Sequence, residues 1–422
     1  MKLTNLNNPF GFELDNLFCI GKRDNNPKRN FLFISKLLGK HIPVHPDVCK
    51  ATGQLLASLY YPQINAAPLV EYLKHPSNNN EEIQSLLNQS VYTDKRTLII
   101  GFAETATGLG MSVASCIRNC VYYSTTRETF TNKEFLFSFE EEHSHATTHK
   151  CYDQLNTSFS SFDEIILVDD EITTGNSMLH LIKQLCRLSG VKKYRILTIL
   201  DWRNDFNKES FKNMQLNEEI DIKVFSVLSG DITVDDHTVF KEGNPPILSK
   251  SISSTNLEAG FLRTKCSNGI KWDDYFYKNS GRLGVYQSEI QEIESFAKKA
   301  AEEIAEKFFK EQSNIRVLVL SEGEDIYIPS RIASCLTSTA DVFFKTTTRS
   351  PIYCDGEIIK EKHQYIGRNE VTYYFYNKSE IEEEYDLVLF LGEFSADIQL
   401  TKNMVSIVFD ACNLENIMTK SA

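Results

Sequence analysis

Residues 165–177 read Ile-Ile-Leu-Val-Asp-Asp-Glu-Ile-Thr-Thr-Gly-Asn-Ser, and this stretch decides the fold of the chain. Its four leading apolar residues predict a buried strand that ends at two adjacent carboxylates, Asp169 and Asp170. Small residues and Gly175 then turn the chain into an amphipathic helix over Met178–Leu188. Because α/β sheets bind their ligands at the carboxyl ends of strands, the stretch predicts a ligand site at this turn.

Outward from this stretch, the sequence alternates between short apolar strands and helices. Further strands are predicted at Thr97–Gly101, Val121–Thr126 and Tyr194–Leu200. A helix face is predicted from apolar residues at helical spacing, namely Val113, Cys116, Ile117 and Cys120. Strands and helices that alternate at this distance predict an α/β fold with a parallel sheet and helices on its faces.

The last third of the chain repeats this alternation, so we expect a second, smaller α/β domain. Ser288 opens a long amphipathic helix, and Gln291 completes a capping-box pattern. Four buried strands are predicted at Arg316–Leu320, Val342–Thr346, Leu387–Leu391 and Val405–Phe409. We therefore predict a first domain over residues 1–240, an irregular connection over 241–280 and a second domain over 281–422.

The composition argues against several classes of protein. The chain has 422 residues, enough for two domains, and its formal net charge of −12 argues against nucleic acid as the main partner. No apolar stretch is long enough to span a bilayer, and the first residues lack the layout of a secretion signal. Ten cysteines are scattered without a Cys-x-x-Cys pair, as in a protein with reduced thiols. We expect a cytoplasmic protein with no membrane partner.

The turn that follows Asp170 has the chemistry of a site for a phosphorylated sugar. Backbone N–H groups at a helix N-terminus, with Thr and Ser hydroxyls beside them, suit a phosphate monoester. Carboxylates accept hydrogen bonds from paired hydroxyls such as those of a ribose. A ribose 5-phosphate unit satisfies both halves of the turn; the alternative is a chance acidic strand end before a capped helix.

Residues 165–177 also resemble the signature with which type I phosphoribosyltransferases bind 5-phosphoribosyl 1-pyrophosphate (PRPP). The resemblance implies that Asp169 and Asp170 act in catalysis by holding the ribose hydroxyls. It also implies a set of PRPP-binding residues: Glu171, Thr173, Thr174, Gly175, Asn176 and Ser177. The family handles PRPP as a magnesium complex, so Mg²⁺ is expected, held mainly by substrate oxygens rather than by protein ligands.

The same family carries a pyrophosphate loop after its first core strand, and residues 101–110 occupy that place, running into a helix at Met111. Glycines in the loop allow close approach of the backbone, and threonine hydroxyls can bind a diphosphate. The candidate residues in the loop are Ala103, Glu104, Thr105 and Thr107. A basic run near the N-terminus adds Lys36 and Lys40 as candidate cations, although such a run is otherwise a solvated face.

Between its second and third core strands, the family has a loop that closes over the reaction, here Arg127–Asp153. The loop contains His143, His145 and His149, of which we take the first two as candidate catalytic residues that accept a proton. The same histidines could instead hold a transition metal, or the loop could do neither. Trp202 follows a strand and is a candidate for stacking on the acceptor, although a Trp there is also commonly a packing residue.

The second unit echoes the first in short stretches, as a degenerate internal repeat would. Residues 121–127 (VYYSTTR) compare with 342–349 (VFFKTTTR), but the third strand of the second unit is followed by no acidic pair. Thr348–Pro351 resembles the TRSP domain of bacterial proteins from tellurium-resistance-associated, stress-response operons. That resemblance implies an orotate-phosphoribosyltransferase-like first domain and a nucleoside-like product. Thr348 and Arg349 either bind a second phosphate-bearing ligand or form a structural turn.

Together these features predict a PRPP-dependent phosphoribosyltransferase that joins ribose 5-phosphate to a base-like acceptor and releases pyrophosphate. Two alternatives stay open: a non-catalytic PRPP or nucleotide sensor, and a hydrolase or phosphorylase that acts on a phosphorylated ribose. The Arg127–Asp153 loop discriminates against a sensor, which needs no closing lid. The acceptor, and whether an N- or C-riboside forms, stay undetermined. Homodimerisation is implied by the family resemblance alone.

Overall fold

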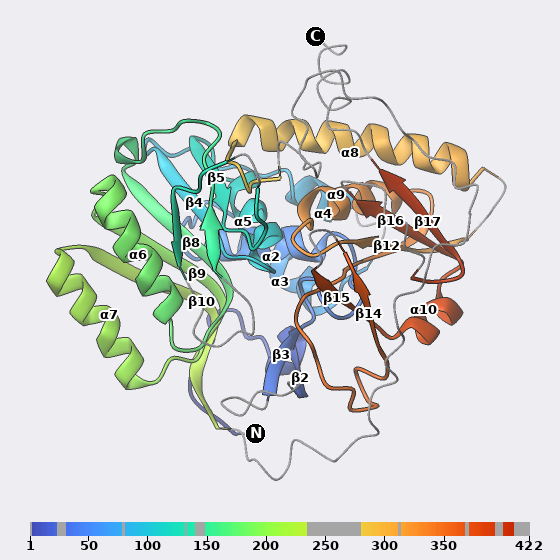
Figure 1. Ribbon diagram of the computed structural model, residues 1–422, viewed down its shortest axis with the longest axis horizontal. Helices are drawn as coiled ribbons and strands as arrows, with labels where there is room; N and C mark the ends of the chain where they lie inside the picture. The colour runs from blue at the N-terminus through green and yellow to red at the C-terminus, as the bar shows by residue number, and fades with distance from the viewer. Residues whose placement is uncertain are drawn as a thin grey trace.

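The computed structural model shows two adjacent α/β units, a larger and a smaller one, each built on its own sheet (Figure 1). It describes residues 2–22, 31–77, 81–130, 133–139, 148–233, 280–310, 314–367, 371–392 and 400–408. The fold class predicted from the sequence is therefore confirmed. In these ranges, no helix combines the length and the apolar character that crossing a membrane requires.

The larger unit is built on a seven-stranded sheet with the order β1-β10-β9-β8-β4-β5-β11. Its parallel centre consists of β10 (Asp221–Thr233), β9 (Lys193–Asp201), β8 (Glu164–Ile172), β4 (Thr97–Gly101) and β5 (Cys120–Ser124). Its antiparallel edges are β1 (Lys2–Asn7) and β11 (Val285–Tyr286). β4 is buried along its whole length, as expected for a central parallel strand between two helical layers.

Helices cover both faces of this sheet. On the face toward the smaller unit lie α2 (Val48–Ser58) and α5 (Ala106–Ser115), and on the outer face lie α6 (Asn176–Ser189) and α7 (Asp205–Glu218) (Figure 1). The shorter helical elements are α1 (Leu14–Leu17), α3 (Ala66–Lys74), α4 (Glu81–Leu86) and the 3₁₀ turn η1 (Phe159–Ser161). Two hairpins stand outside the sheet: β2 (Phe18–Lys22) with β3 (Phe31–Ser35), and β6 (Phe137–Phe139) with β7 (His149–Cys151).

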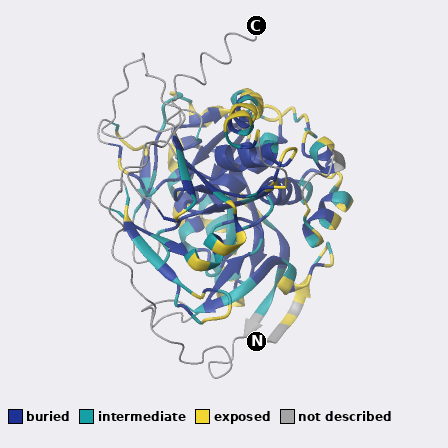
Figure 2. Ribbon diagram, turned by 90° about the vertical axis from the view of Figure 1, so that its right-hand side faces the viewer, coloured by how far each residue is buried: buried dark blue, intermediate teal, exposed yellow. Residues whose placement is uncertain are grey.

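The smaller unit has a four-stranded parallel sheet with the order β13-β12-β16-β17. Its strands are β13 (Asp341–Thr346), β12 (Arg316–Ser321), β16 (Leu387–Gly392) and β17 (Met404–Val408). Its helices are α8 (Gln287–Phe308), α9 (Tyr327–Leu336) and α10 (Lys378–Glu384), and its hairpin pairs β14 (Lys362–Ile366) with β15 (Thr372–Tyr376). Figure 2 shows that the buried residues gather in the two sheets and in the helices between them, with exposed residues at the periphery.

Two helices differ from the sequence-based prediction, and the predicted connection between the domains lies mostly outside the described residues. The helix predicted through Cys120 is too long, because α5 ends at Ser115 and Asn119 turns the backbone at a φ of +65° before β5. α8 begins at Gln287, and its capping partner is Glu289, which accepts the backbone N–H of residue 286 at 2.8 Å, rather than Gln291. Most of the irregular connection expected over 241–280 lies outside the described residues.

Candidate functional site

β8 carries the acidic pair to the carboxyl edge of the larger sheet. The strand continues through Asp169, Asp170 and Glu171 to Ile172, beyond the apolar run that predicted it. The first five residues of the strand are buried, whereas these three carboxylates are only partly buried. The backbone N–H of Asp170 donates to Oδ1 of Asp169 at 2.9 Å. Partly exposed carboxylates thus lie where parallel α/β sheets place their ligands.

The turn between β8 and α6 is shaped by a glycine. Gly175 has a φ of +78°, and a Cβ atom at this position would lie 2.5 Å from the ring of Phe211. The backbone N–H of Asn176 donates to Oγ1 of Thr174 at 3.3 Å. α6 begins at Asn176, so the turn lies at a helix N-terminus, where the backbone N–H groups of the first turn are not used in the helix's own hydrogen bonds. A phosphate monoester suits such an arrangement.

A buried ion pair next to the turn was not predicted from the sequence. Arg203 donates from Nε and Nη2 to the two carboxylate oxygens of Asp201, both at 2.8 Å. Its guanidinium lies 4.2 Å from the ring centroid of Phe211, the ring against which Gly175 packs. The pair therefore supports the turn through Phe211. The sequence signal is the run Asp-Trp-Arg at the end of β9, in which only the tryptophan led to a prediction.

That tryptophan, Trp202, lies beside the acidic strand end. Its Nε1 donates to Oε1 of Glu171 at 2.9 Å. Its ring packs against Phe31 and Phe33 of the β2–β3 hairpin, with centroids 5.6 Å apart in both pairs. Glu171 and Trp202, predicted separately as PRPP and acceptor residues, are thus in direct contact. The sequence did not predict the hairpin, which adds two aromatic rings beside Trp202.

The loop after β4 lies at the same edge of the sheet, because β4 and β8 are neighbouring parallel strands that pair Gly101 with Val168. The backbone N–H of Ala103 donates to Oγ1 of Thr125 at 2.8 Å. The loop is shorter than predicted, because α5 begins at Ala106 rather than at Met111. Gly101 permits the tight turn, since a Cβ atom there would lie 2.3 Å from the carbonyl oxygen of residue 106.

The two later glycines of the predicted loop serve helix packing. Gly108 and Gly110 both lie inside α5. A Cβ atom on Gly108 would lie 2.4 Å from Ile326 of the smaller unit, and one on Gly110 would lie 2.9 Å from Cα of Gly101. The absence of a side chain therefore lets α5 approach the neighbouring unit on one side and its own sheet on the other.

Glu104 is a buried anchor in this loop, with a side chain that is 1% exposed. Nζ of Lys40 lies 3.3 Å from its Oε2. Thr348 Oγ1 and the backbone N–H of Arg349 donate to its two oxygens, at 2.8 and 3.1 Å. Burial acts to raise the pKa of this carboxyl, but nearby positive charges, first that of Lys40, and hydrogen bonds hold the pKa below its ordinary value. The side chain of Glu104 is therefore an ionised carboxylate, and Lys40 balances its charge inside the protein.

Of the other residues predicted to bind pyrophosphate, Thr105 and Thr107 lie at the start of α5, whereas Lys36 contacts another part of the chain. Thr105 and Thr107 are buried, and Oγ1 of Thr107 donates to the carbonyl oxygen of Glu324 at 2.8 Å. Lys36 donates to the carbonyl oxygen of Asp15 at 2.7 Å. The structure thus brings Lys40 to the loop and engages Lys36 in a backbone contact instead.

The β6–β7 hairpin connects to the loop through His149. This histidine is buried, and its Nδ1 lies 3.0 Å from Oγ1 of Thr125, the oxygen that also accepts the N–H of Ala103. Its ring stacks on Phe139 with centroids 4.9 Å apart. His143 and His145, the predicted catalytic histidines, lie outside the described residues. Among the residues that are described, no group of three or more His, Cys, Asp or Glu side chains is placed to hold a metal ion.

Comparison with known proteins identifies the family. A family model described as phosphoribosyl transferase matches residues 17–231, which contain the acidic pair, the turn and the loop after β4. The chain belongs to this phosphoribosyl transferase family. A second model, described as the TRSP domain C-terminal to that transferase, matches residues 279–408, which contain the smaller sheet. No curated protein matches the chain.

Solved phosphoribosyltransferases are similar to the chain only at low identity. Adenine phosphoribosyl transferase from Trypanosoma brucei, in complex with AMP, pyrophosphate and ribose-5-phosphate, is 13% identical with a TM-score of 0.33, and the match covers 57% of this chain and 87% of that one. A hypoxanthine phosphoribosyltransferase from Staphylococcus aureus is 13% identical with a TM-score of 0.22, and the match covers 39% of this chain and 69% of that one. Adenine phosphoribosyltransferase from Saccharomyces cerevisiae is 16% identical with a TM-score of 0.21, and the match covers 32% of this chain and 68% of that one.

In the TRSP domain, Thr348 and Arg349 direct their polar groups at the transferase unit. Besides the contacts with Glu104, the guanidinium of Arg349 pairs with Glu128 of the transferase unit and donates to the hydroxyl of Tyr373 at 3.1 Å. These groups are used within the protein. The geometry therefore favours the structural interpretation of this pair over a second phosphate-bearing ligand.

Proposed function

We propose that this phosphoribosyl transferase joins the ribose 5-phosphate of PRPP to a base-like acceptor and releases pyrophosphate. The observation that carries the proposal is the pair of partly exposed carboxylates, Asp169 and Asp170, at the end of β8 directly before the turn into α6. In the proposed complex these carboxylates accept the ribose 2- and 3-hydroxyls. The turn over residues 173–177, which contains Gly175, receives the 5-phosphate.

The reaction breaks the bond between ribose C1 and a pyrophosphate oxygen and forms a bond between C1 and the acceptor. Positive charge develops on the ribose ring in between, and the carboxylates of Asp169 and Asp170 are proposed to stabilise it. The loop after β4 and Lys40 are proposed to bind the diphosphate that leaves. The proton lost by the acceptor goes to a base, for which His143 and His145 are the candidates from the sequence.

The donor set fits a magnesium complex of the substrate. Carboxylate oxygens such as those of Asp169 and Asp170 suit a hard cation, and an ion held mainly by substrate oxygens needs few ligands from the protein. Bound Mg²⁺ would neutralise charge on the diphosphate. The chain's own residues then orient the ribose and exclude water from C1.

The acceptor site is proposed beside Trp202. Its ring packs with Phe31 and Phe33 and contacts Glu171, the residue after the acidic pair, and such an aromatic group can stack on a flat base. We further propose, from the resemblance to orotate phosphoribosyltransferase and the TRSP proteins of tellurium-resistance-associated operons, that the product is a nucleoside-like metabolite of a bacterial stress response. A cytoplasmic location and domains at 1–240 and 281–422 belong to the same proposal.

The test is release of pyrophosphate from PRPP and Mg²⁺ with a panel of purine, pyrimidine and other nitrogen bases. Asp169→Asn with Asp170→Asn should lower the rate by at least about a hundredfold, because the groups that stabilise the transition state lose their charge. The control, Asp205→Asn with Glu209→Gln, removes two charges from the exposed surface of α7 and should leave the rate unchanged. Tight binding of PRPP without release for every base would contradict the transferase and favour a sensor. Release without a base would favour a hydrolase.

A further inference from the structure

The two units have the same arrangement of core elements. The larger sheet contains the run β5-β4-β8-β9, and the smaller sheet has β13-β12-β16-β17, all parallel and in the same order along the chain. In both units a hairpin is inserted between the second and third of these strands in chain order. An isolated bridge joins each hairpin to its unit, Thr126 with Lys150 and Thr348 with Tyr374. Thr126 and Thr348 are therefore equivalent positions, and each is followed by the arginine that ends the two similar stretches of sequence.

The equivalent residues make reciprocal contacts between the units. In the transferase unit, Glu104 accepts from Thr348 and from the backbone N–H of Arg349. In the TRSP domain, Glu324 accepts from Thr126 and, at 2.7 Å, from the backbone N–H of Arg127. In each unit, a threonine that follows the second core strand and the backbone N–H of the arginine after it donate to a glutamate of the other unit. That glutamate lies in the loop after the other unit's first core strand. Two subunits related by a twofold axis make contacts of this kind.

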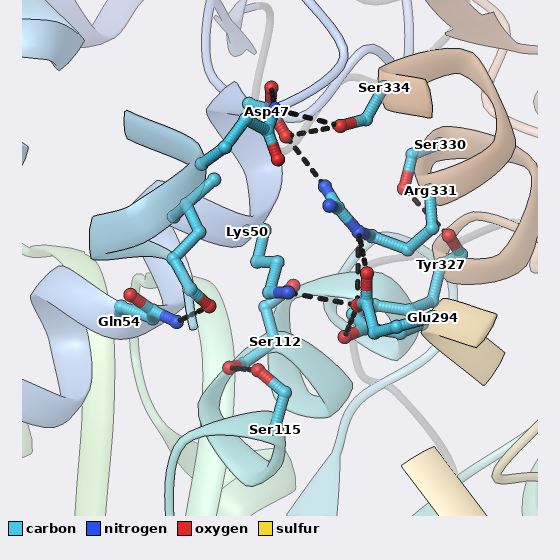
Figure 3. A network of polar contacts seen from close by, with 12 residues as sticks. Asp47, Lys50, Gln54, Ser112, Ser115, Glu294, Tyr327, Ser330, Arg331 and Ser334 are labelled. Atoms are coloured by element: carbon cyan, nitrogen blue, oxygen red, sulfur yellow. Dashed lines mark hydrogen bonds and ion pairs between the residues drawn. The ribbon is translucent and has the colours of Figure 1, made fainter. Parts of the chain in front are cut away.

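Charged residues close the same interface between the helices (Figure 3). Lys50 of α2 donates to Glu294 of α8 at 2.9 Å. Arg331 of α9 donates to Asp47 at 2.6 Å and to Glu294 at 3.0 Å. Lys50 and Arg331 are each buried, so these ion pairs lie inside the interface, where they fix the orientation of the two units.

The loop of the TRSP domain that corresponds to the pyrophosphate loop carries a different charge. Glu322, Glu324 and Asp325 are all buried there. The hydroxyl of Tyr365 donates to Glu322 at 2.9 Å, and a Cβ atom on Gly323 would lie 2.8 Å from the ring of Tyr373. This loop thus buries three acidic side chains where the loop of the transferase unit buries one, Glu104, so it is the less suited of the two to a diphosphate.

We propose that the TRSP domain acts as an internal second subunit, and that Thr348 and Arg349 are positioning residues that hold Glu104 and thereby set the pyrophosphate loop of the transferase unit. The role of that loop rests on the proposed function. Within its own unit, the loop is held by the hydrogen bond that the backbone N–H of Ala103 donates to Thr125. The contact from Thr348 fixes the next residue, so it limits the loop to one conformation before the diphosphate arrives.

The experiment compares Thr348→Val with Thr126→Val. The two threonines are matched, because each donates to a buried glutamate of the other unit and each accepts a backbone N–H two residues later, at 3.1 and 3.0 Å. The full-length variants are examined by amide hydrogen exchange of residues 101–110 and 321–327, by the Kd for pyrophosphate with Mg²⁺, and by the KM for PRPP. Thr348→Ser restores the hydroxyl and serves as the rescue, and thermal unfolding monitors stability.

We expect Thr348→Val to speed exchange in residues 101–110 and to raise the pyrophosphate Kd and the PRPP KM roughly tenfold, as loss of a hydrogen bond to a charged group predicts. Thr126→Val should speed exchange mainly in residues 321–327 and change both constants clearly less than Thr348→Val does. Thr348→Ser should behave like the wild type. These differences should persist even where the two valine variants lose similar stability, which a purely structural role would not produce.

Two results would overturn the inference. One is unchanged exchange of residues 101–110 in Thr348→Val; the other is an equal change of Kd and KM in both valine variants. Failure of the proposed function looks different: wild-type protein then binds neither PRPP nor pyrophosphate. The exchange data would still decide which loop the TRSP domain holds.

Discussion

Gly175 is the residue on which the shape of the phosphate turn depends most directly. Its φ of +78° disfavours any residue with a Cβ atom, and the ring of Phe211 occupies the place that such an atom would take. Phe211 is in turn held by Arg203, which Asp201 neutralises. The turn before α6 is therefore supported by side chains from the segments that follow it, namely β9, the residues after β9 and α7. A substitution at one of these side chains should alter the conformation of the turn.

Gly190 offers a matched comparison for Gly175→Ala, because it has a φ of +68° and no atom lies within 4 Å of the place that its Cβ would take. Gly190→Ala should cost only the strain of the left-handed backbone, about 1–2 kcal/mol of unfolding free energy. Gly175→Ala should cost more, because the methyl group also meets the Phe211 ring, and it should weaken PRPP binding. Urea unfolding measures both costs. Equal costs for the two substitutions would contradict the packing described for the turn.

Among the elements, β8 and α6 could be predicted from the sequence because their apolar residues follow one period and stop at clear signals. Asp169 and Asp170 lie toward the carboxyl end of β8, as predicted, although the strand continues to Ile172 beyond the apolar run. Gly108 and Gly110 were misinterpreted as loop residues because a glycine that allows a helix to pack closely cannot be told from one that allows a ligand to approach. The contact of Glu104 with Thr348 could not be predicted, since it depends on how two units far apart in the sequence dock.

The interface between α2, α8 and α9 should give the protein a stability that depends on pH. Burial acts to raise the pKa of Glu294, but Arg331 and Lys50 outweigh it and lower the pKa to about 2 from an ordinary 4.5. A lowered pKa in the folded protein stabilises it above pH 4.5, and this contribution is lost as the pH falls toward 2. Glu294→Gln should therefore be less stable than the wild type at neutral pH, and the difference should narrow progressively as the pH falls below 4.5.

Unfolding free energies at pH 7, 5 and about 3.5 test this expectation. Glu306→Gln is the control from the same helix, because Glu306 is 68% exposed and pairs with Lys310 at the surface. It should leave the stability nearly unchanged at each pH, because solvent screens an exposed ion pair. A difference between wild type and Glu294→Gln that stays constant with pH would show that the carboxylate does not contribute through its charge.

For the whole molecule, the position of the TRSP domain suggests how the chain assembles. The face of the transferase unit formed by α2 and α5 is covered by α8 and α9 of the same chain (Figure 1). A family resemblance to homodimeric enzymes implied a dimer, but an internal second subunit would take up the surface that a partner needs. One chain then supplies both halves of the assembly.

We therefore expect the protein to be a monomer of 48.3 kDa in solution. Light scattering coupled to size-exclusion chromatography measures the mass directly, at low and at high salt to remove weak charge-driven association. A stable mass of twice this value at both salt concentrations would contradict the expectation and show that another surface mediates pairing.

Calorimetric titration of PRPP with Mg²⁺ tests most directly whether the β8–α6 turn is a ribose 5-phosphate site. The titration is made into the wild type, into Asp169→Asn with Asp170→Asn, and into the surface control Asp205→Asn with Glu209→Gln, all shown by circular dichroism to be folded. We predict saturable binding to the wild type and the control and none to the first double variant. Absence of binding to the wild type, or equal binding to all three proteins, would contradict the assignment of this site.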